Sequence, residues 1–163
     1  MLLYFAYGSN MHPAQMAERC PGARAVGQGV LPGWRFLITT RGTASIIPDR
    51  DSEVHGILWR CGPGHFHALD RYEGVHWRNY VRRPVLVDRP IGAALPAQAY
   101  VSFRRYPGRA RSNYMRTAVI PAARAFGLPG DYIEELESWL PNRIQGPVAT
   151  RYRGRKRQIR HPR

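Results

Sequence analysis

The sequence has 163 residues, 44% of them hydrophobic and 22% charged, which fits one domain with a substantial core and excludes a wholly disordered chain. Its formal net charge is +14, and half of this charge falls in residues 151–163, which hold seven basic residues and no acid. The sequence contains no run of about 18 apolar residues and only two cysteines, Cys20 and Cys61, so we expect neither a membrane-spanning helix nor a disulfide framework.

The first half of the chain predicts mainly strands. Residues 2–7 are apolar and aromatic, which is typical of a buried strand, and residues 13–19 predict a short helix because Pro13 loses no needed N–H in a first turn. Further strands are expected over residues 34–40 and 43–47, joined by a turn at Arg41-Gly42, and over residues 54–59. The apolar residues Phe66, Leu69 and Tyr72 are spaced three apart and predict a helix that ends at Gly74.

The second half continues with strands and ends with helices. Residues 80–87 predict an edge strand or a bulged strand because they contain Pro84, and another strand is expected around residues 99–103. A helix over residues 114–125 should be kinked or restarted at Pro121. A last helix over residues 131–140 is expected to be capped by Asp131 with Glu134 as its partner. Strands first and helices last indicate the α+β class.

Common catalytic templates are missing from the sequence. No serine lies in a G-x-S-x-G pattern, and the only lysine, Lys156, lies in the basic C-terminal segment, so neither a hydrolase elbow nor a P-loop is expected. On a helix, His65 and His67 would point about 200° apart, which argues against a metal site. Cys20 is interpreted as a small buried hydrophobic residue rather than a nucleophile.

A turn of sequence Tyr7-Gly8-Ser9-Asn10 separates the first strand from the first helix. Glycine permits a tight turn, and the backbone N–H groups from Gly8 to Asn10 can then point at one spot, together with the nearby helix start. Such an arrangement binds a carboxylate or a phosphate. The alternative is an ordinary strand-to-helix turn that Ser9 or Asn10 caps.

Glu73 is a candidate proton-transfer residue because it falls at the C-terminal end of a predicted helix, between Tyr72 and Gly74. The partial negative charge of a helix C-terminus, together with burial, would raise the pKa of a carboxyl toward a range useful for general acid–base catalysis. The alternative is a surface glutamate at a helix end. Asp70 is expected to be solvated or bonded within a turn.

Four segments, taken in order, carry a family resemblance: Tyr4-Phe5-Ala6-Tyr7-Gly8-Ser9-Asn10, Val54-His55-Gly56-Ile57-Leu58-Trp59, Leu69-Asp70 through Glu73-Gly74-Val75 with Tyr80 after them, and Asn113-Tyr114 with Gly127-Leu128-Pro129. Together they resemble the γ-glutamylcyclotransferase-like (AIG2-like) family over roughly residues 2–142. Each motif alone is short, and their common order makes the resemblance specific.

The resemblance implies a fold, a reaction and a site. The fold is a small mixed β-sheet curled into a barrel with surrounding helices. The reaction is intramolecular: the α-amine of a γ-glutamyl substrate attacks its own γ-amide and releases 5-oxoproline and an amine or amino acid, without cofactor or metal. Glu73 is implied as the general acid/base, with these substrate-binding residues: Tyr4, Phe5, Ala6, Tyr7, Gly8, Ser9, Asn10, Tyr80 and Tyr114. Tyr80 and Tyr114 could instead pack in the core.

We therefore expect a cytoplasmic enzyme with a catalytic domain at residues 1–145 and a basic tail at residues 146–163. Its expected partner is a small γ-glutamyl substrate. We expect the protein to be a monomer or homodimer that binds no membrane and binds nucleic acid at most weakly, through residues 151–163. The alternatives are a non-catalytic carboxylate-binding or basic adaptor protein of the same fold, and a γ-glutamyl deprotection enzyme of a biosynthetic pathway. The loop of residues 76–79, His-Trp-Arg-Asn, is unusual for the family, so the leaving group stays open.

Overall fold

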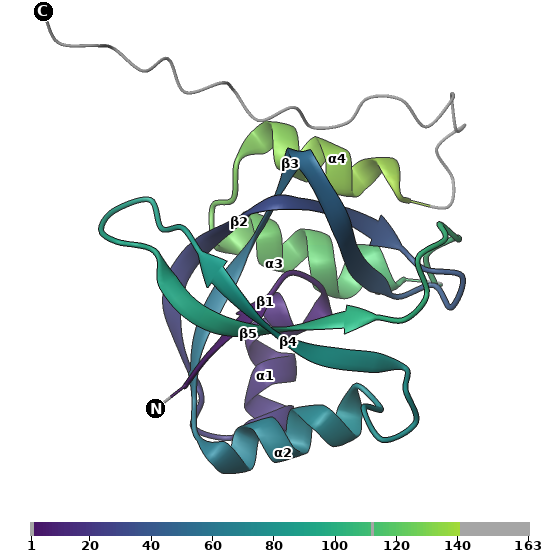
Figure 1. Ribbon diagram of the computed structural model, residues 1–163. Helices are drawn as coiled ribbons and strands as arrows, with labels where there is room; N and C mark the ends of the chain where they lie inside the picture. Colours follow the sequence, from purple (N-terminus) through teal and green to yellow (C-terminus); the bar gives the residue numbers. More distant parts are fainter. Residues whose placement is uncertain (1, 112, 141–163) are drawn as a thin grey trace, which may run out of the picture.

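A five-stranded mixed sheet, in the order β2-β3-β1-β5-β4, organises the protein (Figure 1). The computed structural model describes residues 2–111 and 113–140. The strands are β1 (Leu2–Ala6), β2 (Arg24–Ile38), β3 (Ala44–Cys61), β4 (Tyr80–Val87) and β5 (Leu95–Ser102). The central strand β1 runs antiparallel to β3 and parallel to β5, while β2 pairs with β3 and β4 with β5 in antiparallel fashion. This mixture of strands and separate helices confirms the α+β class.

The hairpin of β2 and β3 is much longer than the sequence pattern predicts. The strands expected at residues 43–47 and 54–59 are two parts of β3, and the strand expected at 34–40 is only the end of β2. Two register shifts, between Ala25 and Gly27 and between Pro32 and Trp34, let the pairing continue past residues that usually mark turns. The prediction of separate short strands was wrong because these irregularities leave one to four residues unpaired without ending the ladder.

The expected closed barrel is also wrong, because β2 and β4 form the two edges of an open sheet. The edges approach at one isolated bridge, where Val30 and Asp88 exchange backbone hydrogen bonds of 2.9 and 2.8 Å. Closure needs a continuous ladder along both edges.

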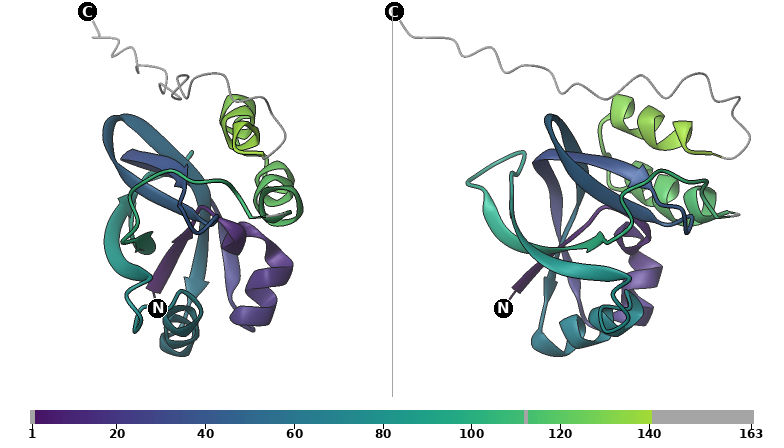
Figure 2. Two further views of the ribbon diagram at one scale, coloured as in Figure 1. Left: turned by 90° about the vertical axis from the view of Figure 1, so that its right-hand side faces the viewer. Right: turned by 45° about the vertical axis from the view of Figure 1, so that its right-hand side comes forward.

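Most of the helices lie on one side of the sheet, as the left view of Figure 2 shows for α1, α3 and α4. Their bounds are α1 (Pro13–Arg19), α2 (Pro63–Tyr72), α3 (Ile120–Ala125) and α4 (Gly130–Ser138); short helical turns η1 (Ser9–Met11) and η2 (Met115–Val119, a π-helix) complete the set. Pro121 lies in the first turn of α3, which confirms the predicted restart. The predicted cap is wrong: α4 begins one residue before Asp131, whose Oδ1 accepts the N–H of Tyr132 instead.

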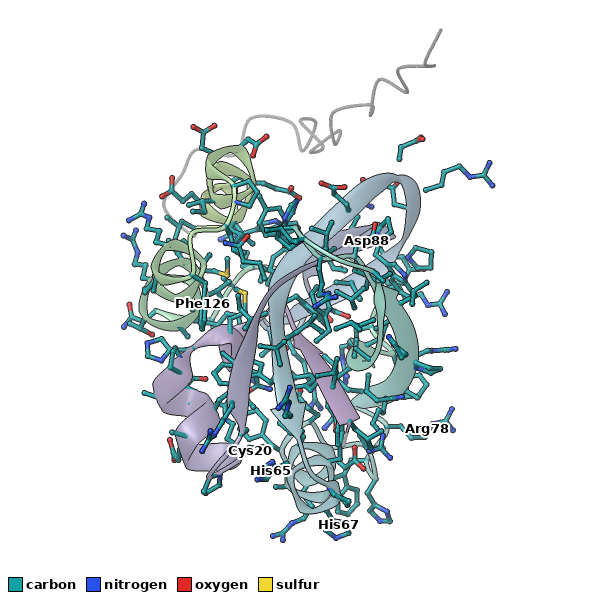
Figure 3. The ribbon with its side chains drawn as sticks, turned by 90° about the vertical axis from the view of Figure 1, so that its left-hand side faces the viewer. Cys20, His65, His67, Arg78, Asp88 and Phe126 are labelled. Atoms are coloured by element: carbon teal, nitrogen blue, oxygen red, sulfur yellow. The ribbon has the colours of Figure 1, made fainter. Side chains whose placement is uncertain are left out.

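The core lies between the sheet and these helices, where Phe5, Phe36 and Leu58 of the strands meet Leu136 of α4. Cys20 is fully buried, as predicted. Figure 3 shows His65 close to Cys20 and His67 farther out on α2, and Nε2 of His65 bonds the carbonyl of Pro21 at 2.9 Å.

The described part of the chain contains no helix long and apolar enough to cross a membrane. Over these same residues, no group of three or more His, Cys, Asp or Glu side chains is placed to hold a metal ion. The predicted basic tail at residues 146–163, with the domain boundary before it, lies outside residues 2–111 and 113–140.

Candidate functional site

A cavity of about 310 Å³ opens where the end of β1, the β2–β3 turn and the end of α2 come together. Its size is at the lower end of the range for small-molecule sites. The residues that line it are Tyr4, Tyr7, Gly8, Ser9, Asn10, Arg41, Thr43, Ala44, Tyr72, Glu73, Asn79, Tyr80, Tyr100, Arg111 and Tyr114. Polar and aromatic side chains dominate this list, and Glu73 is the one acid in it.

The end of α2 places Glu73 at the cavity wall. Phe66 and Leu69 anchor the helix in the core, and the N–H of Glu73 still bonds the carbonyl of Leu69 at 2.8 Å. The helix then stops at Gly74, whose φ of +65° is in the left-handed region that favours glycine. A Cβ on Gly74 would also lie 2.5 Å from Nδ2 of Asn79, so a larger residue here would displace the Asn79 side chain.

The carboxyl of Glu73 is shielded from water, and this burial raises its pKa from 4.5 to about 7. The nearby Arg19 guanidinium and a hydrogen bond from Asn10 oppose the rise but do not cancel it. The sequence-based expectation of a raised pKa is thus confirmed in direction, with desolvation as its main cause. A carboxyl that titrates near neutrality can both accept and return a proton.

Asn10 connects the 7–10 turn to Glu73. Its Nδ2 donates to Oε1 of Glu73 at 3.0 Å and to the hydroxyl of Tyr4 at 2.9 Å, while its Oδ1 accepts from the guanidinium of Arg19. Asn10 is only 3% exposed, so these bonds form away from solvent. Arg19 itself stacks on Tyr72, with its Cζ 3.6 Å from the ring centroid. The turn and the end of α2 are therefore one hydrogen-bonded unit.

The same turn is braced from the other side by Tyr114. The Tyr114 hydroxyl accepts the backbone N–H groups of Ser9 and Ala44, each at 3.3 Å. Gly8 has a φ of −113°, outside the left-handed region, but its ψ of −141° lies outside the usual extended range. It is needed for close approach, because a Cβ there would lie 3.0 Å from Oη of Tyr114 and 3.1 Å from Cβ of Ala44.

Other tyrosines fix the remaining walls through their hydroxyls. Tyr80 donates to the carbonyl of Ala44 and shares a second hydrogen bond with Thr43 Oγ1, both at 2.8 Å. Tyr7 donates to the backbone carbonyl of Tyr100. The Tyr100 hydroxyl donates to Oδ1 of Asp70 at 2.6 Å. Asp70, expected to be solvated or bonded within a turn, is 29% exposed at its side chain and bonds a sheet residue rather than its own turn.

Eight of the ten site residues expected from the sequence line the cavity: Tyr4, Tyr7, Gly8, Ser9, Asn10, Glu73, Tyr80 and Tyr114. Phe5 and Ala6 do not. Both are fully buried, and the Phe5 ring packs against Gly29 and Gly56, where a Cβ would come within 3.2 and 2.9 Å of it. The motif along and after β1 therefore contributes Tyr4 and Tyr7 to the cavity wall and Phe5 and Ala6 to the core alone.

Sequence reasoning missed seven lining residues: Arg41, Thr43, Ala44, Tyr72, Asn79, Tyr100 and Arg111. The turn at Arg41-Gly42 was recognisable as a hairpin turn but gave no sign that it faces the site. Asn79 belongs to the unusual loop after Glu73, which was a usable signal. Arg111 carries no local signal, because only the tertiary structure brings it to Arg41.

Comparisons with known proteins agree on one family. The model of the AIG2-like family matches residues 53–136, about half of the chain. The chain is 27% identical over 157 residues to proteins named Gamma-glutamylcyclotransferase from Mus musculus and Homo sapiens, an alignment that covers 90% of this chain and 83% of each relative. A solved structure named Gamma-glutamyl cyclotransferase matches with a TM-score of 0.80 and 26% identity, over 91% of this chain and 93% of that chain.

Proposed function

The chain belongs to the AIG2-like family, and we propose from this premise that it is a γ-glutamylcyclotransferase with Glu73 as its general acid/base. The enzyme converts a γ-glutamyl compound to 5-oxoproline and a free amine or amino acid. The observation that carries the proposal is the buried carboxyl of Glu73, which titrates near pH 7 inside a polar cavity.

The reaction needs one group that first accepts and then donates a proton. The α-ammonium of the substrate is not nucleophilic until it loses a proton, and the ionised Glu73 carboxylate accepts that proton. The amine nitrogen then bonds to the γ-carbonyl carbon. The bond from that carbon to the leaving nitrogen breaks as Glu73 returns the proton to it. The ring nitrogen still carries a second proton after this step; it gives that proton up to become the lactam N–H, and the released amine takes up a proton and leaves as an ammonium ion, so atoms and charge balance without any further reactant.

The other wall residues hold the substrate in the conformation that cyclises. We assign the α-carboxylate to the 7–10 turn, because the turn is bonded to Glu73 through Asn10 and the amine and carboxylate share one carbon. Burial raises the pKa of Tyr114, so its hydroxyl stays protonated, and since this hydroxyl accepts two backbone N–H groups it can donate its own proton to the substrate. The hydroxyl of Tyr80 already donates to the carbonyl of Ala44, so Tyr80 shapes the cavity wall. Because ring closure is already unimolecular, orientation and proton transfer are the protein's main contributions.

A panel of γ-glutamyl dipeptides and γ-glutamyl amines tests the proposal directly. The purified chain should release 5-oxoproline and the leaving amine in equal amounts from at least one member of the panel. The Glu73→Gln protein should release neither above background while keeping its circular dichroism spectrum. Binding of 5-oxoproline without turnover of any panel member would overturn the enzyme and favour a carboxylate-binding protein of the same fold.

A further inference from the structure

Two arginines line the cavity but have no part in the proton transfer. Arg41 lies in the turn between β2 and β3, and Arg111 lies in the segment between β5 and η2. Glu73, in contrast, comes from the end of α2 and Asn10 from the 7–10 turn. Both arginines are exposed at the cavity wall. The cavity therefore has a second polar region built from its own elements.

The two arginines are held together by backbone contacts rather than placed by chance on the surface. Nε of Arg111 donates to the carbonyl of Arg41 at 2.9 Å, and the N–H of Arg111 donates to the carbonyl of Gly42 at 3.0 Å. A Cβ on Gly42 would lie 2.7 Å from Cγ of Arg111, so the turn and the segment are in direct contact. Nη1 of Arg41 also donates to Oδ1 of Asn79 at 2.9 Å, which ties the pair to the loop after Glu73.

The charge of this pair is not neutralised within the described residues. The partners of both side chains are a carbonyl and an amide oxygen, and none of the ion pairs in residues 2–111 and 113–140 includes either arginine. Among the described residues, Glu73 is the one acid that lines the cavity, and it is partly protonated near neutral pH. The cavity thus carries more positive charge than one substrate carboxylate can balance.

The chemistry of the substrate says where a second anion would lie. Cyclisation folds the glutamyl part into a five-membered ring, with its amine at Glu73 and its α-carboxylate beside it. The leaving nitrogen projects from the γ-carbonyl carbon, away from that carboxylate. A carboxylate on the leaving group is separated from the glutamyl carboxylate by several bonds, so the two cannot share one site. Guanidinium groups suit a carboxylate because they present paired N–H donors.

We propose that Arg41 and Arg111 bind a carboxylate on the leaving group, so that the enzyme discriminates γ-glutamyl amino acids from γ-glutamyl amines. The proposal rests on the proposed function and goes beyond it by assigning leaving-group specificity to two residues. It makes Arg41 and Arg111 specificity-determining residues and leaves the bond-forming steps to Glu73.

The test compares two substrates that differ by one carboxylate, γ-glutamyl-L-alanine and γ-glutamylethylamine. The unmodified enzyme should favour the alanine compound by about tenfold in kcat/KM, a modest factor because both guanidiniums are partly in solvent. In Arg41→Gln and in Arg111→Gln this preference should fall toward one, mainly through a higher KM for the alanine compound. Arg109→Gln is the matched control, because Arg109 is exposed in the same segment but does not line the cavity.

Binding to the Glu73→Gln protein separates recognition from turnover. Calorimetry should give tighter binding of γ-glutamyl-L-alanine than of γ-glutamylethylamine, and adding Arg41→Gln should remove the difference. If neither compound is turned over but the binding preference depends on Arg41, the proposed function fails and the carboxylate site stands. If both compounds are turned over equally well, or if the arginine variants weaken both in parallel, the carboxylate site is wrong.

A measurement on the unmodified chain guards against variants that do not fold. The preference for the alanine compound should shrink as ionic strength rises, because salt screens the exposed guanidiniums. A preference that is insensitive to salt would overturn an electrostatic origin. Arg41→Lys and Arg111→Lys keep the charge and should keep part of the preference.

Discussion

Two glutamates of this protein, Glu73 and Glu135, are shielded from water, and burial raises the pKa of each to about 7. Glu73 lines the cavity and receives a hydrogen bond from Asn10. Glu135 lies on α4, where Arg35 of β2 lowers its pKa and Asp131 raises it, and it does not line the cavity. A raised pKa therefore reports lost hydration, and only the cavity next to Glu73 gives that carboxyl a substrate to act on.

The largest expected difference between the two glutamates is in turnover. Glu73→Gln keeps the side-chain shape and removes the base, so the rate of 5-oxoproline release should fall about 10²–10⁴-fold. Glu135→Gln, the matched control, should stay within about twofold of the unmodified rate. Equal losses in the two variants, measured on folded proteins, would mean that neither carboxyl is the base.

The next largest effect concerns the turn that connects to Glu73. Gly8→Val should weaken 5-oxoproline binding more than about tenfold, because a branched side chain would press on Tyr114 and Ala44. Gly130→Val on the helix of Glu135 is the control, since nothing lies within 4 Å of a Cβ there. Calorimetric titration measures both, and unchanged affinity in Gly8→Val would refute the turn as the carboxylate site.

Both glutamates should make the free energy of unfolding depend on pH in the same direction. An unfolded glutamate titrates near 4.5 and each of these near 7, so the unfolded state binds fewer protons between those values. The free energy of unfolding should therefore decrease as pH rises from about 4.5 to about 7. The loss is on the order of 3 kcal/mol for Glu73 and less for the more solvated Glu135.

Either glutamine variant should flatten this pH dependence. Urea unfolding at pH 5 and pH 8 measures the change in each protein. If the free energy of unfolding changes between pH 5 and pH 8 by the same amount in Glu73→Gln as in the unmodified protein, the carboxyl of Glu73 is hydrated in solution. Its raised pKa is then wrong.

A smaller effect is expected on the pH dependence of turnover when the arginine near each glutamate is replaced. The value of kcat/KM should rise with pH through about 7 as Glu73 loses its proton. Arg19 favours the ionised form of Glu73, so Arg19→Gln should move this rise to higher pH. Arg35→Gln, which removes the corresponding arginine from Glu135, should leave the pH profile in place. A profile that follows Arg35 instead would point to Glu135.

The smallest effect is expected far from both carboxyls. We propose that residues 146–163 are a basic tail outside the catalytic domain, and deletion of residues 151–163 should change turnover by less than about twofold. Any binding to nucleic acid should decrease, and the remainder should be strongly salt-dependent. A tenfold loss of activity in a truncated protein with an unchanged circular dichroism spectrum would place the tail in the mechanism.

The sequence by itself determined the family, the α+β class and the key members of the site. A glycine turn after a buried strand and a glutamate at a helix end are local patterns, because each depends on a few neighbouring residues. The 7–10 turn and Glu73 could therefore be found from local patterns, whereas Tyr4, Tyr80 and Tyr114 were expected from the family resemblance. The edge strand at Pro84 and the restarted helix at Pro121 follow from the missing N–H of proline in the same local way.

Only the tertiary structure decided the long β2–β3 hairpin, the open sheet and the seven cavity-lining residues that the sequence did not predict. Whether a glycine ends a strand or sits in a bulge depends on the pairing partner, which local patterns do not contain. The same holds for Phe5, which belongs to the site motif yet faces the core. Arg41 and Arg111 are 70 residues apart, and the contact of their two segments is what makes them neighbours. Desolvation likewise depends on the whole fold, which is why the value near 7 for the pKa of Glu73 required the structure.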